Sequence, residues 1–160
     1  MIFNPLHFYK LNFSKNKELY KSFNNLLGFV PNRIHIYKQA LTHQSFYKFN
    51  KSKKNDNERL EYLGDAILDA IVGDMLFKKF PFKGEGFLTE MRSKVVSRNS
   101  LSNLSRKMGI LQYIRYDKKN QKNKSFINQI SGNALEAIFG AIYLDKGYNF
   151  TYRFFENRIF

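Results

Sequence analysis

The chain contains no cysteine, and this absence excludes disulfide bonds and thiolate metal sites. Only three of its 160 residues are histidine, so any metal site must rely mostly on oxygen ligands. Long apolar runs are also missing: residues 1–20 are interrupted by Asn, Pro, His and Lys, and no stretch is long enough to span a bilayer. We therefore expect a cytoplasmic chain without a membrane partner.

Acidic residues are scarce as well. The chain has 13 Asp and Glu against 27 Lys and Arg, which gives a formal net charge of +14. A basic surface attracts polyanions through counterion release, and nucleic acid is the most common such partner. Codon composition offers another explanation, because AT-rich codons would also enrich Lys, Asn, Ile, Phe and Tyr. The charge therefore favours nucleic-acid binding without excluding a mutational origin.

Helical periodicity dominates the chain, and the alternation typical of strands is nearly absent. At 160 residues with 43% hydrophobic content, the chain can form one domain with a substantial core. We predict a single all-α domain over residues 1–160, with roughly seven or more helices and no internal repeat. The expected helices cover residues 15–27, 34–43, 57–80, 89–96, 98–108, 128–144 and 148 to the end, with Gly28, Pro81 and Gly147 as stops.

Loops are expected at residues 49–57, 82–87 and 116–125, where the sequence is polar or bounded by glycine. Two of these loops are rich in lysine, at residues 51–54 and 118–124. If the chain binds nucleic acid, these lysines are candidates for phosphate contacts. Ordinary solvated loops would have the same composition, so both interpretations remain open.

The long helix predicted from residue 57 carries three acids on one stripe, because Glu58, Glu61 and Asp65 follow i, i+3, i+7 spacing. Asp65 stands before an apolar segment, where a carboxylate costs several kcal/mol unless it is paired, protonated or bound to a metal. Gly64 costs about 1 kcal/mol against Ala in mid-helix, which indicates a close approach by another chain or a ligand. Alternatively, the glutamates face solvent and pair with Arg59.

A second acidic helix contains the segment "SGNALEAIFGAIYLD", residues 131–145. Asn133 and Glu136 are three residues apart and therefore share one face of it. If that face meets Glu61 and Asp65 of the long helix, the four side chains form a cluster of oxygen ligands. Oxygen ligands favour a hard cation such as Mg²⁺ or Mn²⁺.

The segment "NERLEYLGDAIL", residues 57–68, resembles the signature of the ribonuclease III family nearly residue for residue. Three further segments follow in the family's order: "ALTHQS" at 40–45, "FPFKGEGFLTEMRSKVVS" at 80–97 and "LEAIFGAIYLDKG" at 135–147. Together they extend the resemblance over about residues 25 to 150. A match of several ordered segments is more specific than a lone motif.

The resemblance implies a nuclease domain that forms a symmetric homodimer through the signature helix and cleaves double-stranded RNA. Its expected substrates are structured precursors such as ribosomal RNA, with 5′-phosphate and 3′-hydroxyl product ends. By resemblance, Glu61 and Glu136 are metal ligands, and Asp65 is an essential carboxylate that orients the attacking water. Glu58 and Glu85 are accessory residues near the substrate or the dimer junction. The implied cofactor is Mg²⁺, for which Mn²⁺ is expected to substitute.

Position 133 departs from the family, which has aspartate where this chain has Asn133. An amide oxygen can still bind Mg²⁺, but one negative charge is lost, so we expect weaker metal binding and a lower rate. An engineered substitution, a natural loss of activity and a tolerated variant all remain open. Asn133 also supports an alternative function, a catalytically silent relative that binds or scaffolds structured RNA. A helical nucleotide pyrophosphohydrolase is disfavoured by the positive charge.

The chain also departs from the family in length, because it ends at Phe160, whereas most bacterial members carry a C-terminal double-stranded-RNA-binding domain. A shortened piece of a longer protein and a naturally reduced enzyme both remain open. Without that domain, we expect the affinity for RNA to come from the nuclease domain. Since the deep major groove of duplex RNA offers little base readout, recognition should be mainly of shape and phosphate. His43, at a predicted helix end, is expected to make a structural hydrogen bond.

Overall fold

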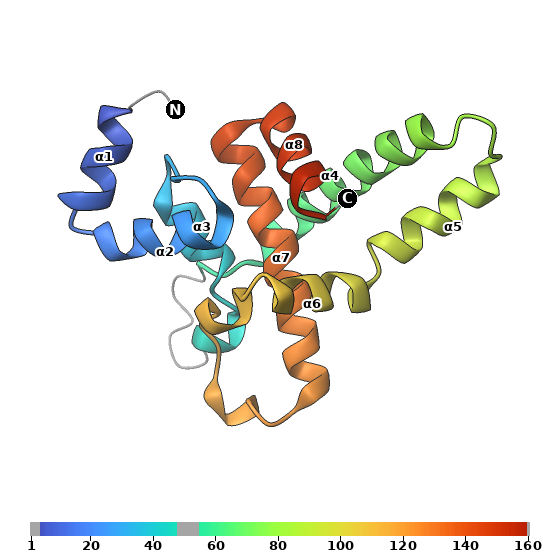
Figure 1. Cartoon of the computed structure of the whole chain (residues 1–160). Helices are drawn as coiled ribbons and strands as arrows, with labels where there is room; N and C mark the ends of the chain where they lie inside the picture. The colour runs from blue at the N-terminus through green and yellow to red at the C-terminus, as the bar shows by residue number, and fades with distance from the viewer. Residues whose placement is uncertain (1–3, 48–54, 160) are drawn as a thin grey trace.

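The computed structural model describes residues 4–47 and 55–159. In these ranges the chain forms α-helices and short 3-10 helices, with no strand and one isolated bridge between Thr42 and Arg115 (Figure 1). The all-α prediction is confirmed. Within the same ranges, no helix has the length and apolar character needed to cross a membrane. The α-helices are α1 (Pro5–Asn12), α2 (Lys17–Leu27), α3 (Ile34–Ala40), α4 (Glu58–Lys79), α5 (Glu85–Val95), α6 (Arg98–Lys107), α7 (Lys124–Lys146) and α8 (Tyr148–Ile159), and the 3-10 helices are η1 (Gln44–Tyr47), η2 (Ile110–Tyr113) and η3 (Lys118–Asn120).

Helix α7 is the centre of the fold, and α3, α4, α6 and α8 pack around it (Figure 1). Its middle is buried on nearly all sides, which is expected of a helix whose sequence is apolar around its whole circumference. The fully buried run includes Ala134, Leu135, Ala137, Ile138 and Phe139. The polar positions on this helix are therefore few, and they fall on the side that meets α4 and α6.

Helices α4 and α7 cross in direct backbone contact at Gly64 and Gly140. A Cβ atom at Gly64 would overlap the carbonyl oxygen of Glu136 and lie 2.9 Å from the amide nitrogen of Gly140. A Cβ atom at Gly140 would overlap the carbonyl oxygen of Leu60. The close approach predicted at Gly64 is therefore present, but it comes from α7 of the same chain rather than from a second chain or a ligand. This contact brings the acidic stripe of α4 beside Glu136.

Three helix starts differ from the sequence expectation. Helix α1 was not expected, although Asn4 caps it by accepting from the amide of His7 at 3.2 Å and Pro5 occupies its first turn. Helix α5 begins at Glu85 rather than at residue 89, so the second half of the loop predicted at residues 82–87 is helical. Glycine in this stretch argued for a loop, but Thr89 donates to Glu85 at 2.9 Å across the first turn.

Helix α7 begins at Lys124, four residues before the expected start. The side chain of Asn123 accepts from the amide of Phe126 at 3.1 Å and caps the helix. The predicted basic loop before it is partly ordered as η3. The expected stops at Gly28 and Gly147 are confirmed, since both residues cap their helices with positive φ.

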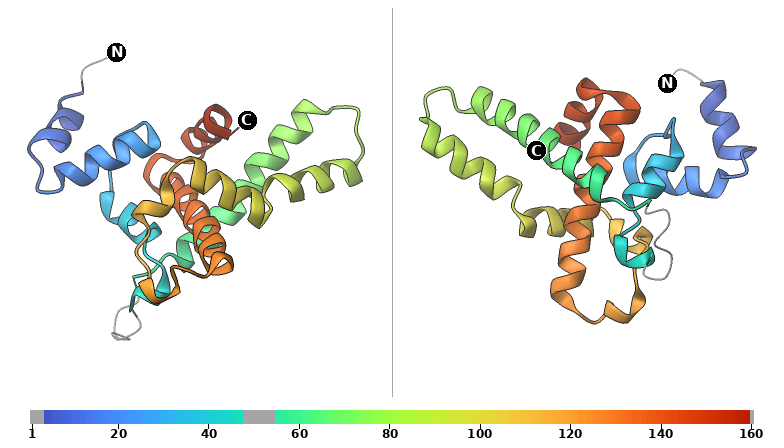
Figure 2. Two further views of the ribbon diagram at one scale, coloured as in Figure 1. Left: turned by 60° about the horizontal axis from the view of Figure 1, so that its bottom comes forward. Right: turned by 180° about the vertical axis from the view of Figure 1, so that it is seen from behind.

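The second half of α4 and the whole of α5 project from the body of the molecule as an antiparallel pair (Figures 1 and 2). Within the described chain, α5 has no buried residue. Two aromatic side chains of this projecting region are strongly exposed: Phe77 on α4, at 70%, and Phe82 in the connection to α5, at 98%. A single chain therefore leaves this surface uncovered.

Candidate active site

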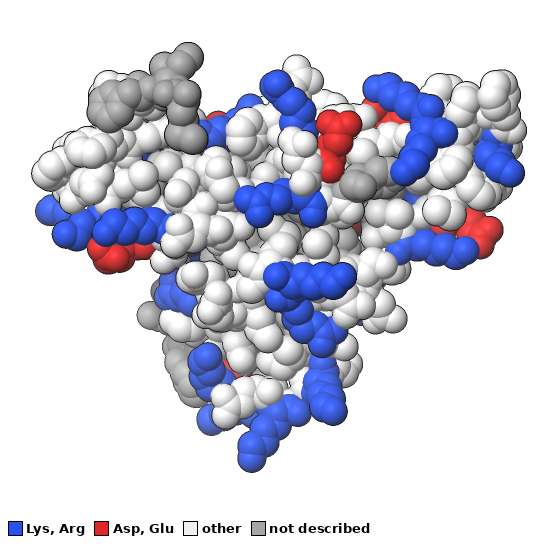
Figure 3. All heavy atoms as spheres, viewed as in Figure 1, with Lys and Arg blue, Asp and Glu red and all other residues white. Residues whose placement is uncertain are grey.

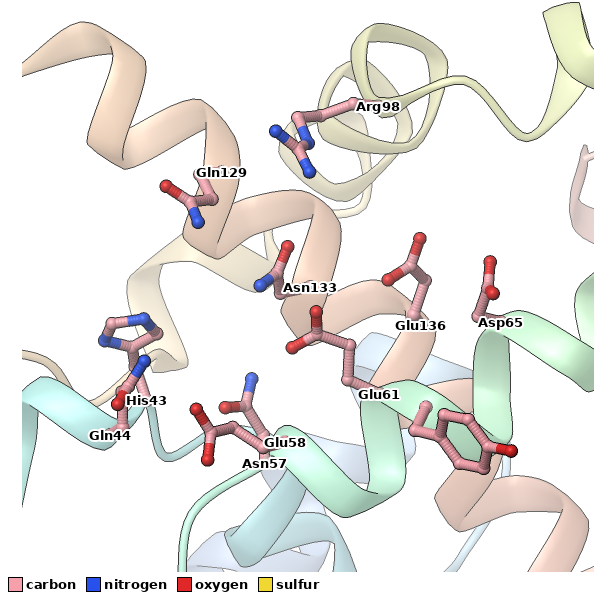
Figure 4. Close-up of a pocket in the computed structure, with 11 residues that line it drawn as sticks. His43, Gln44, Asn57, Glu58, Glu61, Asp65, Arg98, Gln129, Asn133 and Glu136 are labelled. Carbon is pink, nitrogen blue, oxygen red and sulfur yellow. The ribbon is translucent and has the colours of Figure 1, made fainter.

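The acids predicted from the sequence meet in one cavity of about 600 Å³ between α4, α6 and α7. Glu58, Glu61 and Asp65 enter it from α4, and Asn133 and Glu136 enter it from α7 (Figure 4). The crossing at Gly64 is what brings the two sets of side chains together. Five of the six predicted site residues thus share one cavity.

Glu85 is the exception. It lies at the start of α5, on the projecting helix pair, and lines a separate hollow with Phe77 and Arg92. Its carboxylate accepts a hydrogen bond from Thr89 at 2.9 Å. Within one chain Glu85 does not join the acidic cavity, so its accessory role stays a prediction that concerns the dimer junction.

Asp65 was expected to be surrounded by apolar residues, and this expectation is wrong. Its side chain is exposed at the edge of the cavity, because the neighbouring Gly64 is the residue that faces α7. Glu136, rather than Asp65, is the carboxylate whose charged form is destabilised by burial. Burial raises the pKa of Glu136 to about 7, and the nearby charges of Asp65 and Glu61 add to the effect.

Glu61 is crowded in the same way. Burial raises its pKa, while a side-chain hydrogen bond with Asn133 acts in the opposite direction. The charges of Glu58 and Asp65 raise the pKa of Glu61 further. Carboxylates from two helices therefore repel one another across the cavity, and Asn133 supplies an amide that stabilises one of them.

The described residues that line the cavity include one cationic side chain, Arg98, from the first turn of α6. Its charge lowers the pKa of both Glu61 and Glu136, although burial and the other acids outweigh it. Sequence reasoning missed Arg98, because its place depends on how α6 packs on α7. Gln129 was also missed, and its position four residues before Asn133 on α7 was a usable signal.

One end of the cavity is lined by neutral polar side chains. The Nδ1 atom of His43 accepts from the amide of Ser45 at 3.1 Å and lies 2.9 Å from the Ser45 hydroxyl oxygen, so the expected structural hydrogen bond is present. Burial lowers the pKa of His43, and the imidazole is therefore neutral at neutral pH. Asn57 is buried at the same end, and within the described chain neither side-chain polar atom has a partner.

The donor set fits a hard divalent cation in its chemistry. Glu61, Asp65 and Glu136 offer carboxylate oxygens, and Asn133 offers an amide oxygen. Burial, followed by repulsion between the acids, raises the pKa values of Glu61 and Glu136, and a bound cation would offset that repulsion. In the described ranges, however, no three His, Cys, Asp or Glu side chains stand close enough to hold a metal ion as they are arranged. The carboxylates must therefore turn toward one another to bind one.

The fold and the cavity together define a helical domain with an acid-lined, enzyme-type site at the crossing of its two longest helices. Residues 33–160 match the family model described as Ribonuclease-III-like. The chain is 46% identical to Ribonuclease 3 of Bacteroides thetaiotaomicron over 160 residues, which is 99% of this chain and 50% of that relative. The chain belongs to the ribonuclease III family, as its sequence motifs indicated.

Solved structures agree with this assignment. The nuclease domain of ribonuclease III from Campylobacter jejuni aligns with a TM-score of 0.76 and 34% identity, covering 91% of this chain and 95% of that domain. A second structure of this nuclease domain, also from Campylobacter jejuni, aligns with a TM-score of 0.74 and 34% identity. The alignment covers 86% of this chain and 98% of that chain, and that structure is described as showing structural flexibility in the region involved in dimer formation. The chain spans about half the length of the curated relatives it matches.

Proposed function

We propose that this domain is a Mg²⁺-dependent endonuclease of double-stranded RNA whose rate is lowered by Asn133. The observation that carries the proposal is the meeting of Glu61 and Asp65 with Glu136 in one cavity. Relatives at this level of identity are named Ribonuclease 3, and five of the six site residues predicted from the sequence line this cavity. Ribosomal RNA precursors as substrates, 5′-phosphate and 3′-hydroxyl product ends, and action in the cytoplasm are parts of the same proposal.

In this proposal the metal ligands are Glu61, Asp65, Asn133 and Glu136. Mg²⁺, or Mn²⁺ in its place, supplies charge neutralisation at the scissile phosphate and lowers the pKa of a bound water. Glu136 must lose its proton to act as a ligand, and with a pKa of about 7 it does so near neutrality. Asp65, exposed at the cavity edge, can reach a water or a metal there. Asn133 contributes no charge, so cation binding is weaker than with a carboxylate.

RNA binding is supported by the charge of the chain and by where the lysines lie. Lys and Arg predominate over Asp and Glu on the face seen in Figure 3. Lys118, Lys119, Lys122 and Lys124, from the predicted basic loop, are all exposed. They are proposed to contact phosphates outside the cavity. The other lysine-rich loop, residues 51–54, lies outside the described residues.

A homodimer is the second part of the proposal. The projecting pair of α4 and α5 has exposed aromatic residues, and α5 has no buried residue within the described chain. Helix α5 packs on α4 through side chains that are only partly buried, so a partner surface is expected to cover its remaining exposed face. A second copy of the chain, docked through the signature helix α4, would provide that surface. It would also bring Glu85 to the junction.

The alternative is a catalytically silent protein that binds structured RNA, and Asn133 is the feature that favours it. Incubation with long double-stranded RNA and Mg²⁺ separates the two functions. We expect slow cleavage to fragments with 5′-phosphate ends, abolished by EDTA and by Glu136→Gln. Binding of RNA without cleavage, by the wild-type chain and by Asn133→Asp alike, would replace the nuclease proposal with the silent one.

A further inference from the structure

Arg98, the first residue of α6, brings a positive charge to the edge of the acidic cavity. It stands in the first turn of α6, whose N-cap residue Ser97 accepts from the amide of Ser100 at 3.3 Å. Figure 4 shows its guanidinium at the α6 side of the acidic cavity, on the side of Gln129 and Asn133 of α7. The side chain is nevertheless exposed, so a ligand that enters the cavity can reach it.

The backbone at Arg98 is held in place by α7. A Cβ atom built on Gly132 would lie 3.8 Å from the carbonyl oxygen of Arg98 and 3.9 Å from the amide of Ser102. Gly132 immediately precedes Asn133 in the sequence, so this packing contact sets Arg98 next to the candidate metal ligands. The cation is therefore positioned by two packed helices rather than by a mobile loop.

Arg98 is not committed to an ion pair. Exposed cations elsewhere on the molecule close onto acids, as Lys94 does with Glu90 at 2.6 Å and Lys78 with Asp74 at 2.7 Å. Among the described residues, no carboxylate forms such a pair with Arg98, although Glu61 and Glu136 feel its charge. Its hydrogen-bond donors therefore remain available to a ligand.

We propose that Arg98 holds a phosphate of the bound RNA strand beside the acidic cavity; this inference rests on the proposed nuclease function. A guanidinium presents five donors in a planar fork that matches two phosphate oxygens at once. When a cation neutralises the acids, a backbone phosphate becomes the strongest remaining partner for Arg98. Arg98 then fixes the strand relative to Asp65 and Glu136, whereas the lysines near residues 118–124 contribute only general attraction.

The test is binding of a short labelled RNA duplex, measured by fluorescence anisotropy over a series of salt concentrations, with Ca²⁺ in place of Mg²⁺. We expect Arg98→Gln to weaken binding about tenfold and to reduce the slope of log K against log salt by about 1. Arg98→Lys should keep most of the slope but recover only part of the affinity, because it retains the charge without the fork. Thermal melting of each variant checks that the fold is intact.

Arg153→Gln on α8 is the matched control, since it removes the same charge from a residue that lies outside the cavity. It should leave the slope nearly unchanged. Equal losses in the two variants, or an Arg98→Gln variant that binds RNA as the wild-type chain does while its melting temperature shifts, would overturn the inference and leave Arg98 as a charge-balancing residue. A wild-type chain that binds no RNA would instead overturn the proposed function itself, so the two failures are distinguishable.

Discussion

Glu136 is the residue at which burial and like charge act together. Its pKa is raised to about 7 from an ordinary value of 4.5, so the folded chain binds this proton more tightly than the unfolded chain does. Stability that depends on the protonated form is complete below pH 4.5 and is lost as the pH rises toward 7. Without a cation, the folded domain should therefore be less stable at pH 8 than at pH 5.

Glu136→Gln should remove most of this pH dependence. In EDTA at pH 8 we expect the variant to be more stable than the wild-type chain by about 1–2 kcal/mol, a figure reduced for solvent screening because Glu136 is only half-buried. Urea unfolding across pH 5–8 measures the difference. Glu90→Gln is the control, because Glu90 pairs with Lys94 on the surface and its pKa is lowered, outside this window. Parallel pH profiles for the wild-type chain and Glu136→Gln would contradict the assignment.

At this scale the sequence predicted residue types better than their environments. Helical spacing predicted that Glu61 and Asp65 share one face of α4, but whether Glu136 of α7 meets them depends on how the two helices cross. The sequence did not show that Asp65 is exposed while Glu136 is half-buried, since that depends on which side of α4 meets α7. The place of Arg98 in the cavity could not be predicted either, because it depends on how α6 packs on α7, a helix that is distant in the sequence.

At the scale of elements, the crossing of α4 and α7 positions the candidate site. Gly64→Ala would push a methyl group into the carbonyl oxygen of Glu136, and neither backbone can move without separating the acids. We expect a loss of about 3 kcal/mol in the free energy of unfolding, measured by urea denaturation. Cation binding should weaken as well.

Gly73 offers a control on the same helix. A Cβ atom there would meet nothing within 4 Å, so Gly73→Ala should stabilise the domain by about 0.5–1 kcal/mol through helix propensity alone. If both alanine variants were neutral or both were stabilising, the close crossing would not be what holds the two helices together.

The sequence predicted the main helices well and their starts less well. Apolar periodicity is strong inside α4 and α7, whereas the first turns of α5 and α7 carry it only in part. Asn123 caps the start of α7, and α5 begins at Glu85 without a side-chain cap, where Thr89 donates a hydrogen bond to the Glu85 carboxylate one turn later. The cap of α1, Asn4 followed by Pro5, was a recognisable start signal that apolar periodicity did not reveal.

For the whole molecule, the projecting α4–α5 pair predicts association of two copies. Sedimentation velocity should find a dimer at micromolar concentration, and Phe77→Glu should shift it toward monomer, because a charge would enter the covered surface. Phe13→Glu is the control, since Phe13 is also exposed, at 67%, but lies beside α1. A clean monomer for the wild-type chain, or equal effects of the two glutamates, would contradict a dimer built on this surface.

Position 133, where an amide stands among the carboxylates of the cavity, is the residue on which the proposed activity most depends. The most direct test is the single-turnover rate of double-stranded RNA cleavage in Mg²⁺ by the wild-type chain and by Asn133→Asp, measured in parallel. Restoring one negative charge should strengthen cation binding and raise the rate by about tenfold or more, an amount typical of a single charged ligand. Slow cleavage by the wild-type chain with faster cleavage by the variant is the predicted result. No cleavage by either chain, at Mg²⁺ and RNA concentrations where both bind the duplex, would contradict it.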